Sequence, residues 1–295
     1  GRSGVRRTEG GLVMVDLSCE MGALRMKNPV TVASGTFGVG RDFAAFVDLD
    51  RLGAITSKGV SAEPWPGNPG TRIAETPSGM LNSIGLQNPG VEAFCENDLP
   101  WLSCTDTPLI VNVSGHTVDE YVRVIERLEC EERVSAYEIN ISCPNVDAGG
   151  LTFGTDPACA AAVVSACRKA TRRPCFAKLT PNVTDVTEIA RACVDAGADG
   201  ISMINTVLGM AIDAHARKPV FARGVGGLSG PAIKPIALAQ VHAVQGAVDV
   251  PIIGMGGIAC ALDAPDDLQV IDGIESWCVA EGVERVSELV GALQI

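Results

Sequence analysis

Histidine is scarce in this sequence, and its cysteines form no motif. The three histidines lie far apart, and the eleven cysteines include no CxxC pair. Structural zinc sites bring such ligands together at close spacing, and disulfide-rich domains carry cysteines in a regular framework. The sequence therefore indicates neither a metal site nor a disulfide framework. Unpaired thiols persist in a reducing compartment, so we predict a cytoplasmic protein.

Long apolar runs and basic runs are also missing. No stretch approaches the roughly 18 apolar residues that indicate a membrane span. The net charge is -12, which disfavours nucleic acid or an anionic membrane surface as the main partner. With 295 residues, of which 46% are hydrophobic, the chain can bury a large core, and a small-molecule partner fits better.

One domain accounts for nearly the whole chain. Residues 1–11, GRSGVRRTEGG, are small, polar and basic without an apolar segment, so we interpret them as a disordered lead-in or a cloning remnant. The remainder contains no low-complexity segment and no obvious linker. We therefore expect a single domain over residues 12–295, which is enough for an α/β barrel of about 250 residues.

Short β-rich runs alternate with helical patterns along this domain. Strands are predicted at residues 30–33, 54–57, 109–113, 136–141, 175–179, 200–204 and 250–254. Helices are predicted at residues 118–131, 156–169, 185–195 and 231–246. Thr117 with Glu120 would cap the first helix, and Thr155 with Pro157 in the first turn would cap the second. This alternation implies βαβ units and a parallel sheet.

Polar residues follow the predicted strands at their carboxyl ends. They are Lys58, Asn112, Asn140 with Cys143, Lys178, Asn205 with Thr206, and Gly256 with Gly257. A doubly wound sheet would spread these ends along a line, whereas a (β/α)8 TIM barrel gathers them around one mouth, so we predict the barrel. A single lysine there is more often a solvated side chain. Lys58 and Lys178 beside asparagines favour an anionic or electron-rich ligand.

The segment EINISCPN, residues 138–145, carries the densest chemistry. A short apolar strand leads into Asn140, Ser142, Cys143 and Asn145. Amide and hydroxyl groups crowded around one thiol are costly to bury without a polar ligand. For the octapeptide alone, a buried cysteine in a polar turn is the ordinary alternative. The position at a strand's carboxyl end favours an active-site thiol.

Three glycine-bearing loops complete the predicted mouth. VPIIGMGGIA, residues 250–259, matches the GxGxxA form of the dinucleotide fingerprint. It lies near the C-terminus rather than in the first βα unit, so we interpret it as a barrel loop that approaches a phosphate. GVGGLSGPAIKP, residues 224–235, is either a second such loop or an ordinary turn. NSIGLQNPG, residues 82–90, is predicted to be an irregular loop that covers a substrate.

Ten strings in chain order carry a family resemblance. They are ASGTFG, SKGV, NSIGLQNPG, NVSG, EINISCPNV, GGLTFGTDP, KLTPN, INTVLGMAID, GGLSGPAIKP and PIIGMGGI. Together they resemble the class 1 dihydroorotate dehydrogenases, specifically the class 1B catalytic subunit. The resemblance implies an FMN-dependent oxidoreductase with a TIM barrel, which oxidises dihydroorotate to orotate in pyrimidine biosynthesis.

The resemblance also implies roles for individual residues. Cys143 would be the catalytic base that takes the C5 proton, while a hydride leaves C6 for the flavin, and Lys58 would favour the thiolate. The substrate-binding residues would be Lys58, Asn82, Ser83, Ile84, Gly85, Leu86, Asn140, Asn145, Asn205 and Thr206. The FMN-binding residues would be Ser34, Lys58, Gly59, Asn112, Asn140, Lys178, Ile204, Gly230, Gly256 and Gly257.

One segment departs from the family pattern. After GMGGIAC the family continues with a helix and an eighth strand whose GT pair binds the FMN phosphate, but here Ala264 is followed directly by PDDLQVIDGIESW. Either a deletion has removed the eighth βα unit, or the sequence omits a disordered stretch. We expect the second, because an open barrel would leave two strand edges unpaired.

Electrons would have to leave the flavin through another protein, because the sequence contains no iron–sulfur or NAD motif. The resemblance implies a partner subunit that carries FAD and [2Fe–2S] and reduces NAD, with a homodimer of catalytic chains at the core of a heterotetramer. Two alternatives remain open. One is the flavin domain of a dihydropyrimidine dehydrogenase, and the other is a catalytically impaired barrel that serves as a binding or scaffold subunit.

Overall fold

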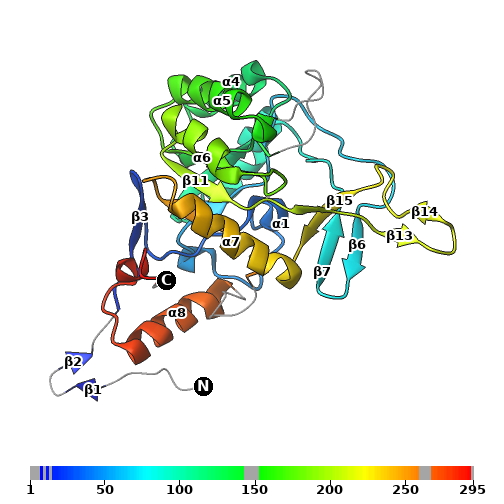
Figure 1. Cartoon of the computed structure of the whole chain (residues 1–295). Coiled ribbons are helices and arrows are strands. Elements are labelled where there is room, and N and C mark those ends of the chain that lie inside the picture. The colour runs from blue at the N-terminus through cyan, green and yellow to red at the C-terminus, as the bar shows by residue number, and fades with distance from the viewer. Residues whose placement is uncertain (1–6, 9–10, 13–14, 143–152, 259–266, 294–295) are drawn as a thin grey trace.

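A computed structural model describes residues 7–8, 11–12, 15–142, 153–258 and 267–293 (Figure 1). Its centre is a six-stranded parallel sheet in the order β16-β11-β10-β9-β8-β5. The strands are β5 (Ile55–Thr56), β8 (Leu109–Val113), β9 (Val134–Ile139), β10 (Cys175–Lys178), β11 (Gly200–Met203) and β16 (Ile252–Gly254). They neighbour one another in chain order, as the strands of a TIM barrel do. The predicted strand at 30–33 is present as one parallel bridge from Thr31 to Ala54, beside β5.

Within the described ranges, the barrel has no eighth βα unit. Among the described residues, no strand joins β16 to Thr31, which lie at the two ends of the curled sheet. The sequence runs without interruption from Ala264 to Pro265. The expectation that the sequence omits a disordered stretch is therefore wrong, and the unit is missing from the chain itself.

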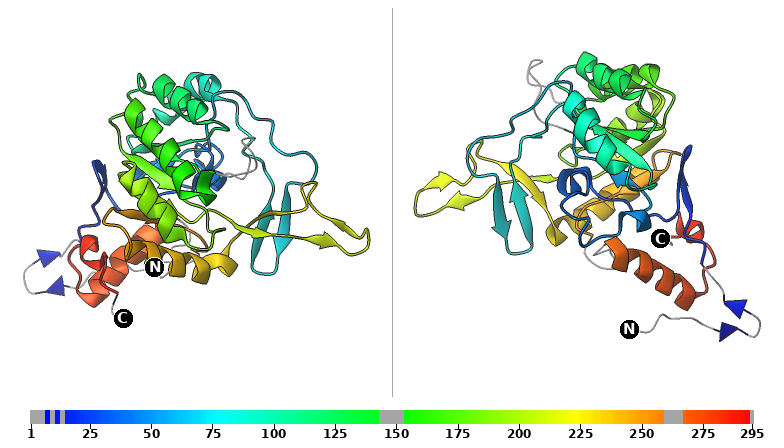
Figure 2. Two further views of the ribbon diagram at one scale, coloured as in Figure 1. Left: turned by 45° about the horizontal axis from the view of Figure 1, so that its top comes forward. Right: turned by 180° about the vertical axis from the view of Figure 1, so that it is seen from behind.

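Four helices cover the outside of the sheet. They are α4 (Val118–Leu128), α5 (Pro157–Ala170), α6 (Val186–Asp195) and α7 (Lys234–Gln245). Successive helices in this row contact each other, and both views in Figure 2 show α4, α5 and α6 packed together. Each buries one apolar face, such as Val124, Ile125 and Leu128 of α4, against the strands.

The helix caps partly follow the prediction. Thr117 caps α4, because its side chain accepts the N–H of Glu120 at 3.3 Å. The predicted cap of α5 at Thr155 is wrong. Asp156 caps that helix instead and accepts the N–H of Cys159 at 2.8 Å. An aspartate directly before the first helical residue competes for this position with the threonine before it.

The last α-helix, α8 (Asp267–Glu281), lies below α7 in Figure 1. Val270 and Ile271 pack against Val30, and Asp272 pairs with Arg51. This helix therefore packs beside the first strand position. Among the described helices, none combines the length and the apolar character that a membrane crossing requires.

A second, antiparallel sheet was not predicted from the sequence. It comprises β6 (Ile73–Thr76), β7 (Gly79–Asn82), β12 (Val207–Gly209) and β15 (Gly226–Ser229), in the order β12-β15-β7-β6. The hairpin β13 (Ile212–Asp213) and β14 (Lys218–Pro219) extends beyond it in Figure 1. The glycine-rich segment 224–235, predicted as a loop or turn, thus contains strand β15.

Short elements complete the chain. The helical ones are α1 (Ser34–Phe37), α2 (Val91–Ala93), a π-helical turn (Phe94–Asp98), α3 (Leu99–Leu102) and 3-10 turns at Leu49–Arg51, Phe153–Thr155, Pro231–Ile233 and Val286–Leu289. The hairpins are β1 (Arg7–Thr8) with β2 (Gly11–Leu12) and β3 (Cys19–Met21) with β4 (Leu24–Met26).

The barrel interior is layered by the two-residue period of its strands. An apolar cluster that includes Ile110, Ala136 and Phe176 packs against Met21 and Leu24 of the β3–β4 hairpin. Two residues further along β8, β9 and β10 the same face of each strand presents polar groups. The hairpin thus closes the amino-terminal end of the barrel, and the polar groups lie toward the carboxyl ends of the strands.

Candidate active site

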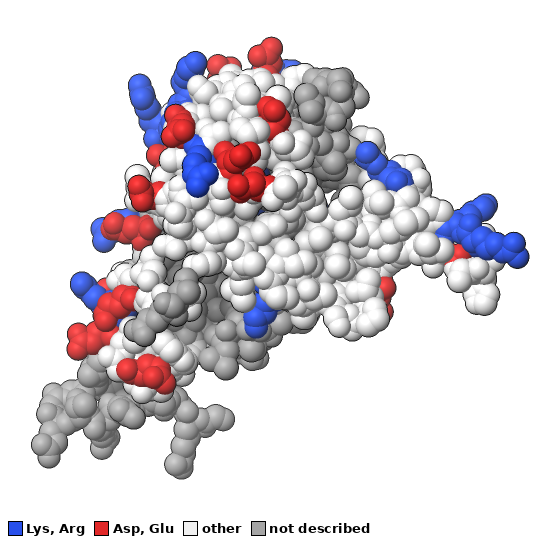
Figure 3. Space-filling view, in the orientation of Figure 1, with Lys and Arg blue, Asp and Glu red and all other residues white. Residues whose placement is uncertain are grey.

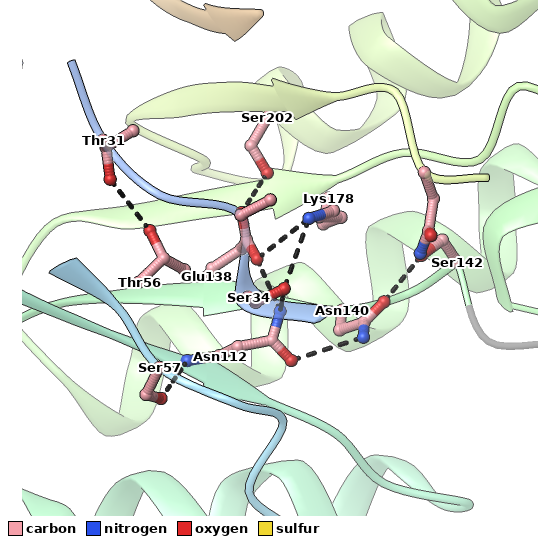
Figure 4. A network of polar contacts seen from close by, with 12 residues as sticks. Thr31, Ser34, Thr56, Ser57, Asn112, Glu138, Asn140, Ser142, Lys178 and Ser202 are labelled. Atoms are coloured by element: carbon pink, nitrogen blue, oxygen red, sulfur yellow. Dashed lines mark hydrogen bonds and ion pairs between the residues drawn. The ribbon is translucent and has the colours of Figure 1, made fainter. Parts of the chain in front are cut away.

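A buried polar layer lies directly above the apolar cluster. It consists of Asn112 on β8, Glu138 on β9, Lys178 on β10 and Ser202 on β11, each no more than 4% exposed. Lys178 Nζ lies 3.3 Å from Glu138 Oε1. Asn112 Nδ2 donates to Glu138 Oε1 at 2.5 Å, and Ser202 Oγ donates to Oε2 at 2.6 Å. Figure 4 shows these side chains converging from four adjacent strands.

Helix α1 contributes a hydroxyl to this layer. Ser34 Oγ lies 3.4 Å from both Lys178 Nζ and Asn112 Nδ2 (Figure 4). The structure therefore brings together three of the predicted FMN-binding residues, although they lie in distant parts of the sequence.

The predicted substrate residues continue the network toward the mouth. Asn140 Nδ2 donates to Asn112 Oδ1 at 3.3 Å, and Ser142 Oγ donates to Asn140 Oδ1 at 2.6 Å. Asn205 Nδ2 in turn donates to Ser142 Oγ. The amides of Asn112, Asn140 and Asn205 are thus connected, the last two through the Ser142 hydroxyl. Figure 4 shows the part of this chain from Asn112 to Ser142. Tyr121 of α4 supports it from outside, because its hydroxyl donates to the backbone oxygen of Asn140 at 2.8 Å.

Lys58 lies at the same mouth, just beyond β5. Its Nζ donates to the backbone oxygen of Gly35, which is next to Ser34, at 3.2 Å. Burial lowers the pKa of the Lys58 ammonium from its usual value. The next residue, Gly59, packs against the polar layer. A Cβ added there would lie 3.1 Å from both Asn112 Oδ1 and Ser114 Oγ. A side chain at Gly59 would crowd the Asn112 amide.

The loop predicted to cover a substrate approaches these groups. Asn82, the last residue of β7, donates from Nδ2 to the backbone oxygen of Gly227 at 3.2 Å. Thr206 packs so closely on Gly227 that an added Cβ there would lie 2.1 Å from its Oγ1. Leu86 lies near Gly59, since a Cβ added at Gly59 would lie 3.8 Å from Leu86 Cδ2. The antiparallel sheet therefore carries the loop from Asn82 to Leu86 to the site.

That loop is shaped by left-handed backbone conformations. Gly85 has φ +72° and Leu86 has φ 51°, which is rare for a leucine. The neighbouring Ser83 Oγ accepts from Asn68 Nδ2 at 3.0 Å, and the Ile84 backbone oxygen accepts from the Asn68 N–H at 3.0 Å. Asn68 thus holds the loop from behind.

The glycine positions border the site at the end of the sheet. Gly256 follows β16 and packs against Ile204, because a Cβ added at Gly256 would lie 3.1 Å from Ile204 Cγ1. Gly257 has φ +72°, and an added Cβ would lie 2.5 Å from the backbone nitrogen of Lys234, at the start of α7. Gly230 packs on Gly79 of β7. Only glycines allow the backbone to approach the start of a helix this closely.

Cys143 and Asn145, predicted as the base and a substrate ligand, lie outside the described residues. Within the ranges that the structure describes, no group of three His, Cys, Asp or Glu side chains is placed to hold a metal ion. On the face shown in Figure 3, acidic and basic side chains are interspersed and leave a broad uncharged area over α7 and β15.

Comparisons with known proteins identify the family. The family model described as dihydroorotate dehydrogenase matches residues 16–270. This chain belongs to the dihydroorotate dehydrogenase family. It is 52% identical to the protein of Pelobacter propionicus named dihydroorotate dehydrogenase B (NAD(+)), catalytic subunit, over 95% of this chain and 99% of that protein. Proteins of the same name from Alkaliphilus oremlandii and Trichlorobacter lovleyi are 51% and 49% identical, over 94% of this chain and 99% and 98% of theirs.

The match to the Pelobacter propionicus dihydroorotate dehydrogenase also bears on the missing unit. It spans 300 aligned positions but takes in only 95% of this 295-residue chain. That dehydrogenase therefore has residues without a counterpart here, as a shortened barrel requires.

Sequence reasoning missed two members of the polar layer, Glu138 and Ser202. A signal was present, because Glu138 is a carboxylate within an apolar strand and lies two residues before Asn140. Residues two apart on a strand share a face, so both side chains must enter the same interior.

Proposed function

We propose that this chain catalyses the FMN-dependent oxidation of dihydroorotate to orotate, as the catalytic part of an NAD-linked enzyme. The observation that carries the proposal is the buried layer of Asn112, Glu138 and Lys178 below the amides of Asn140 and Asn205, in a chain that belongs to this family. The layer joins residues that the family resemblance assigns to flavin with residues that it assigns to substrate.

The donor set fits FMN. Lys178, Asn112 and Ser34 present an ammonium, an amide and a hydroxyl at one place, and these groups suit the carbonyl oxygens and ring nitrogens of an isoalloxazine. At the end of the sheet, Gly256 and Gly257 lie close to the start of α7, an arrangement that suits a phosphate. When bound, FMN supplies the acceptor for the hydride that leaves C6 of dihydroorotate.

The chain's own residues handle the proton and the substrate. Cys143 would remove the C5 proton as a thiolate, and the Lys58 ammonium would favour that thiolate. Asn82, Asn140, Asn145, Asn205 and Thr206 would bind the carboxylate, carbonyls and ring N–H groups of dihydroorotate. Residues 83–86 would close over it and exclude water.

Electron transfer and assembly complete the proposal. A partner subunit that carries FAD and [2Fe–2S] would accept the electrons and reduce NAD, and two catalytic chains would form the core of a heterotetramer. The names of the relatives, which specify NAD(+) and a catalytic subunit, support a partner of this kind. We further propose that residues 12–295 act as one FMN-binding domain in the cytoplasm.

A substrate comparison tests the proposal. Protein reconstituted with excess FMN is mixed with an artificial electron acceptor and either dihydroorotate or dihydrouracil. We expect reduction of the acceptor and orotate formation with dihydroorotate alone. Turnover of dihydrouracil instead would indicate a dihydropyrimidine dehydrogenase-like domain. Turnover of neither would indicate an impaired barrel.

A further inference from the structure

Glu138 uses both carboxylate oxygens within the polar layer. Oε1 lies within reach of two donors, Asn112 Nδ2 at 2.5 Å and Lys178 Nζ at 3.3 Å. Oε2 accepts from Ser202 Oγ at 2.6 Å. The two donors at Oε1 are both proposed FMN ligands, so a single carboxylate orients both of them.

The Lys178–Glu138 ion pair is buried, so its charges are poorly screened by water. Lys178 and Glu138 are 4% and 1% exposed, and the apolar cluster lies below them. The partners that α1, β8 and β11 contribute, Ser34, Asn112 and Ser202, are uncharged. Lys58, which lies just beyond β5 at the same mouth, donates to the backbone oxygen of Gly35 instead. In such a low-dielectric place, Glu138 is the counter-ion of Lys178.

We propose that Glu138 is a positioning residue that acts through Lys178 and holds down the reduction potential of bound FMN. It orients the ammonium and the Asn112 amide, and its negative charge offsets the charge that Lys178 directs at the flavin. This inference rests on the proposed function, because it requires FMN beside Lys178. The offset makes reduced FMN a better donor to the next acceptor than it would be beside an unpaired ammonium.

The variant Glu138→Gln separates charge from position. A glutamine amide can still accept from Asn112 and Lys178 through its oxygen and can donate to Ser202, but it is neutral. The negative charge that FMN gains on reduction would then face an uncompensated ammonium. We expect the midpoint potential of bound FMN to rise by at least about 30 mV. For a two-electron couple this is a tenfold change in the equilibrium constant of reduction.

Two further variants test whether the shift in the FMN potential acts through Lys178. Glu129→Gln is the matched control, because Glu129 accepts from Tyr137 and Thr171 and pairs with Arg173 outside the polar layer. It should leave the FMN potential unchanged. In a Lys178→Met background, the ammonium through which Glu138 acts is absent, so adding Glu138→Gln should no longer shift the potential.

The experiment first measures FMN binding by fluorescence titration and then the FMN potential against redox dyes. Wild-type protein that binds no FMN overturns the proposed function and this inference with it. FMN that binds normally, with an unchanged or lowered potential in Glu138→Gln, overturns only this inference.

Melting temperatures without FMN provide a readout that does not need the cofactor. The double variant Glu138→Gln/Lys178→Met should melt above either single variant, because each single change leaves one buried member without its partner. This comparison stands even where Glu138→Gln alone folds poorly. Strictly additive effects would overturn the pairing.

Discussion

Lys58 holds an ammonium group at the barrel mouth, where water is partly excluded. Burial lowers its pKa from the usual value of about 10.4. The folded chain therefore releases this proton at a lower pH than the unfolded chain does. Between the two pKa values the unfolded state binds more protons, so stability rises with pH. The loss of folding stability that the buried Lys58 ammonium causes is therefore largest below the folded-state pKa. It disappears as the pH reaches the unfolded-state pKa.

This gives a pH-dependent prediction for Lys58→Met. Without FMN, the variant should melt above the wild type near neutral pH, and the difference should shrink as the pH rises toward about 10. Thermal melts of both proteins across this range provide the measurement. A difference that stays constant or grows with pH would contradict the assigned burial effect.

Cys143 carries the prediction for proton removal. Cys143→Ser should slow flavin reduction by dihydroorotate by at least about 10²-fold at neutral pH, because a serine hydroxyl ionises far less readily than a thiol. Stopped-flow mixing of the FMN-loaded protein gives the rate. The affinity for FMN should not change. Cys104→Ser, which alters an exposed thiol, is the control. A near-normal rate in the Cys143 variant excludes it as the base.

The site residues that could be predicted from the sequence are those whose position at the end of a strand determines where their side chains lie. Asn112, Asn140 and Lys178 end strands, so their convergence follows from the barrel topology, and the structure confirms it. Glu138 was missed because a buried carboxylate is explained only by its partners. Those partners, Lys178 and Ser202, come from other strands.

Element boundaries depend on local chemistry and on long-range pairing to different degrees. The Thr117 part of the α4 cap is local and was predicted correctly, whereas the Glu120 carboxylate accepts the N–H of His116. Strand β15 could not be predicted, because the segment Gly226–Ser229 is extended through pairing with β7 and β12, which lie elsewhere in the sequence. Its glycines conceal this tendency, since glycine is a poor strand former.

The α4 cap gives a stability prediction. Thr117→Ala should lower the free energy of unfolding by about 1 kcal/mol, because the N–H of Glu120 loses its side-chain acceptor. Thr117→Ser retains a hydroxyl and should retain most of the stability. Urea unfolding of the three proteins gives the comparison. Equal losses in both variants would mean that the methyl group, and not the cap, stabilises the helix.

At the scale of the whole molecule, the missing eighth unit should weaken FMN binding. The family's strand-eight pair would add backbone hydrogen bonds to the phosphate, and losing two such bonds weakens binding by roughly 3 to 6 kcal/mol, or two to four orders of magnitude. FMN should therefore separate from the protein on gel filtration. Adding it back should raise the melting temperature with concentration. Tightly held FMN in a chain of this mass would contradict the prediction.

The partner makes a second prediction at this scale. The isolated chain with FMN should reduce artificial acceptors but not NAD, because the sequence contains no motif for NAD or an iron–sulfur cluster. Absorbance of NADH in a steady-state assay reports the outcome. Direct reduction of NAD by the purified single chain would show that no partner is needed.

The most direct test of the central claim follows the flavin in a single anaerobic experiment. The chain is saturated with FMN, dihydroorotate is added, and the visible flavin absorbance and the orotate formed are recorded. We predict that the absorbance is lost and that orotate appears in an amount equal to the bound FMN. Bound FMN that keeps its absorbance in the presence of dihydroorotate would contradict the assignment.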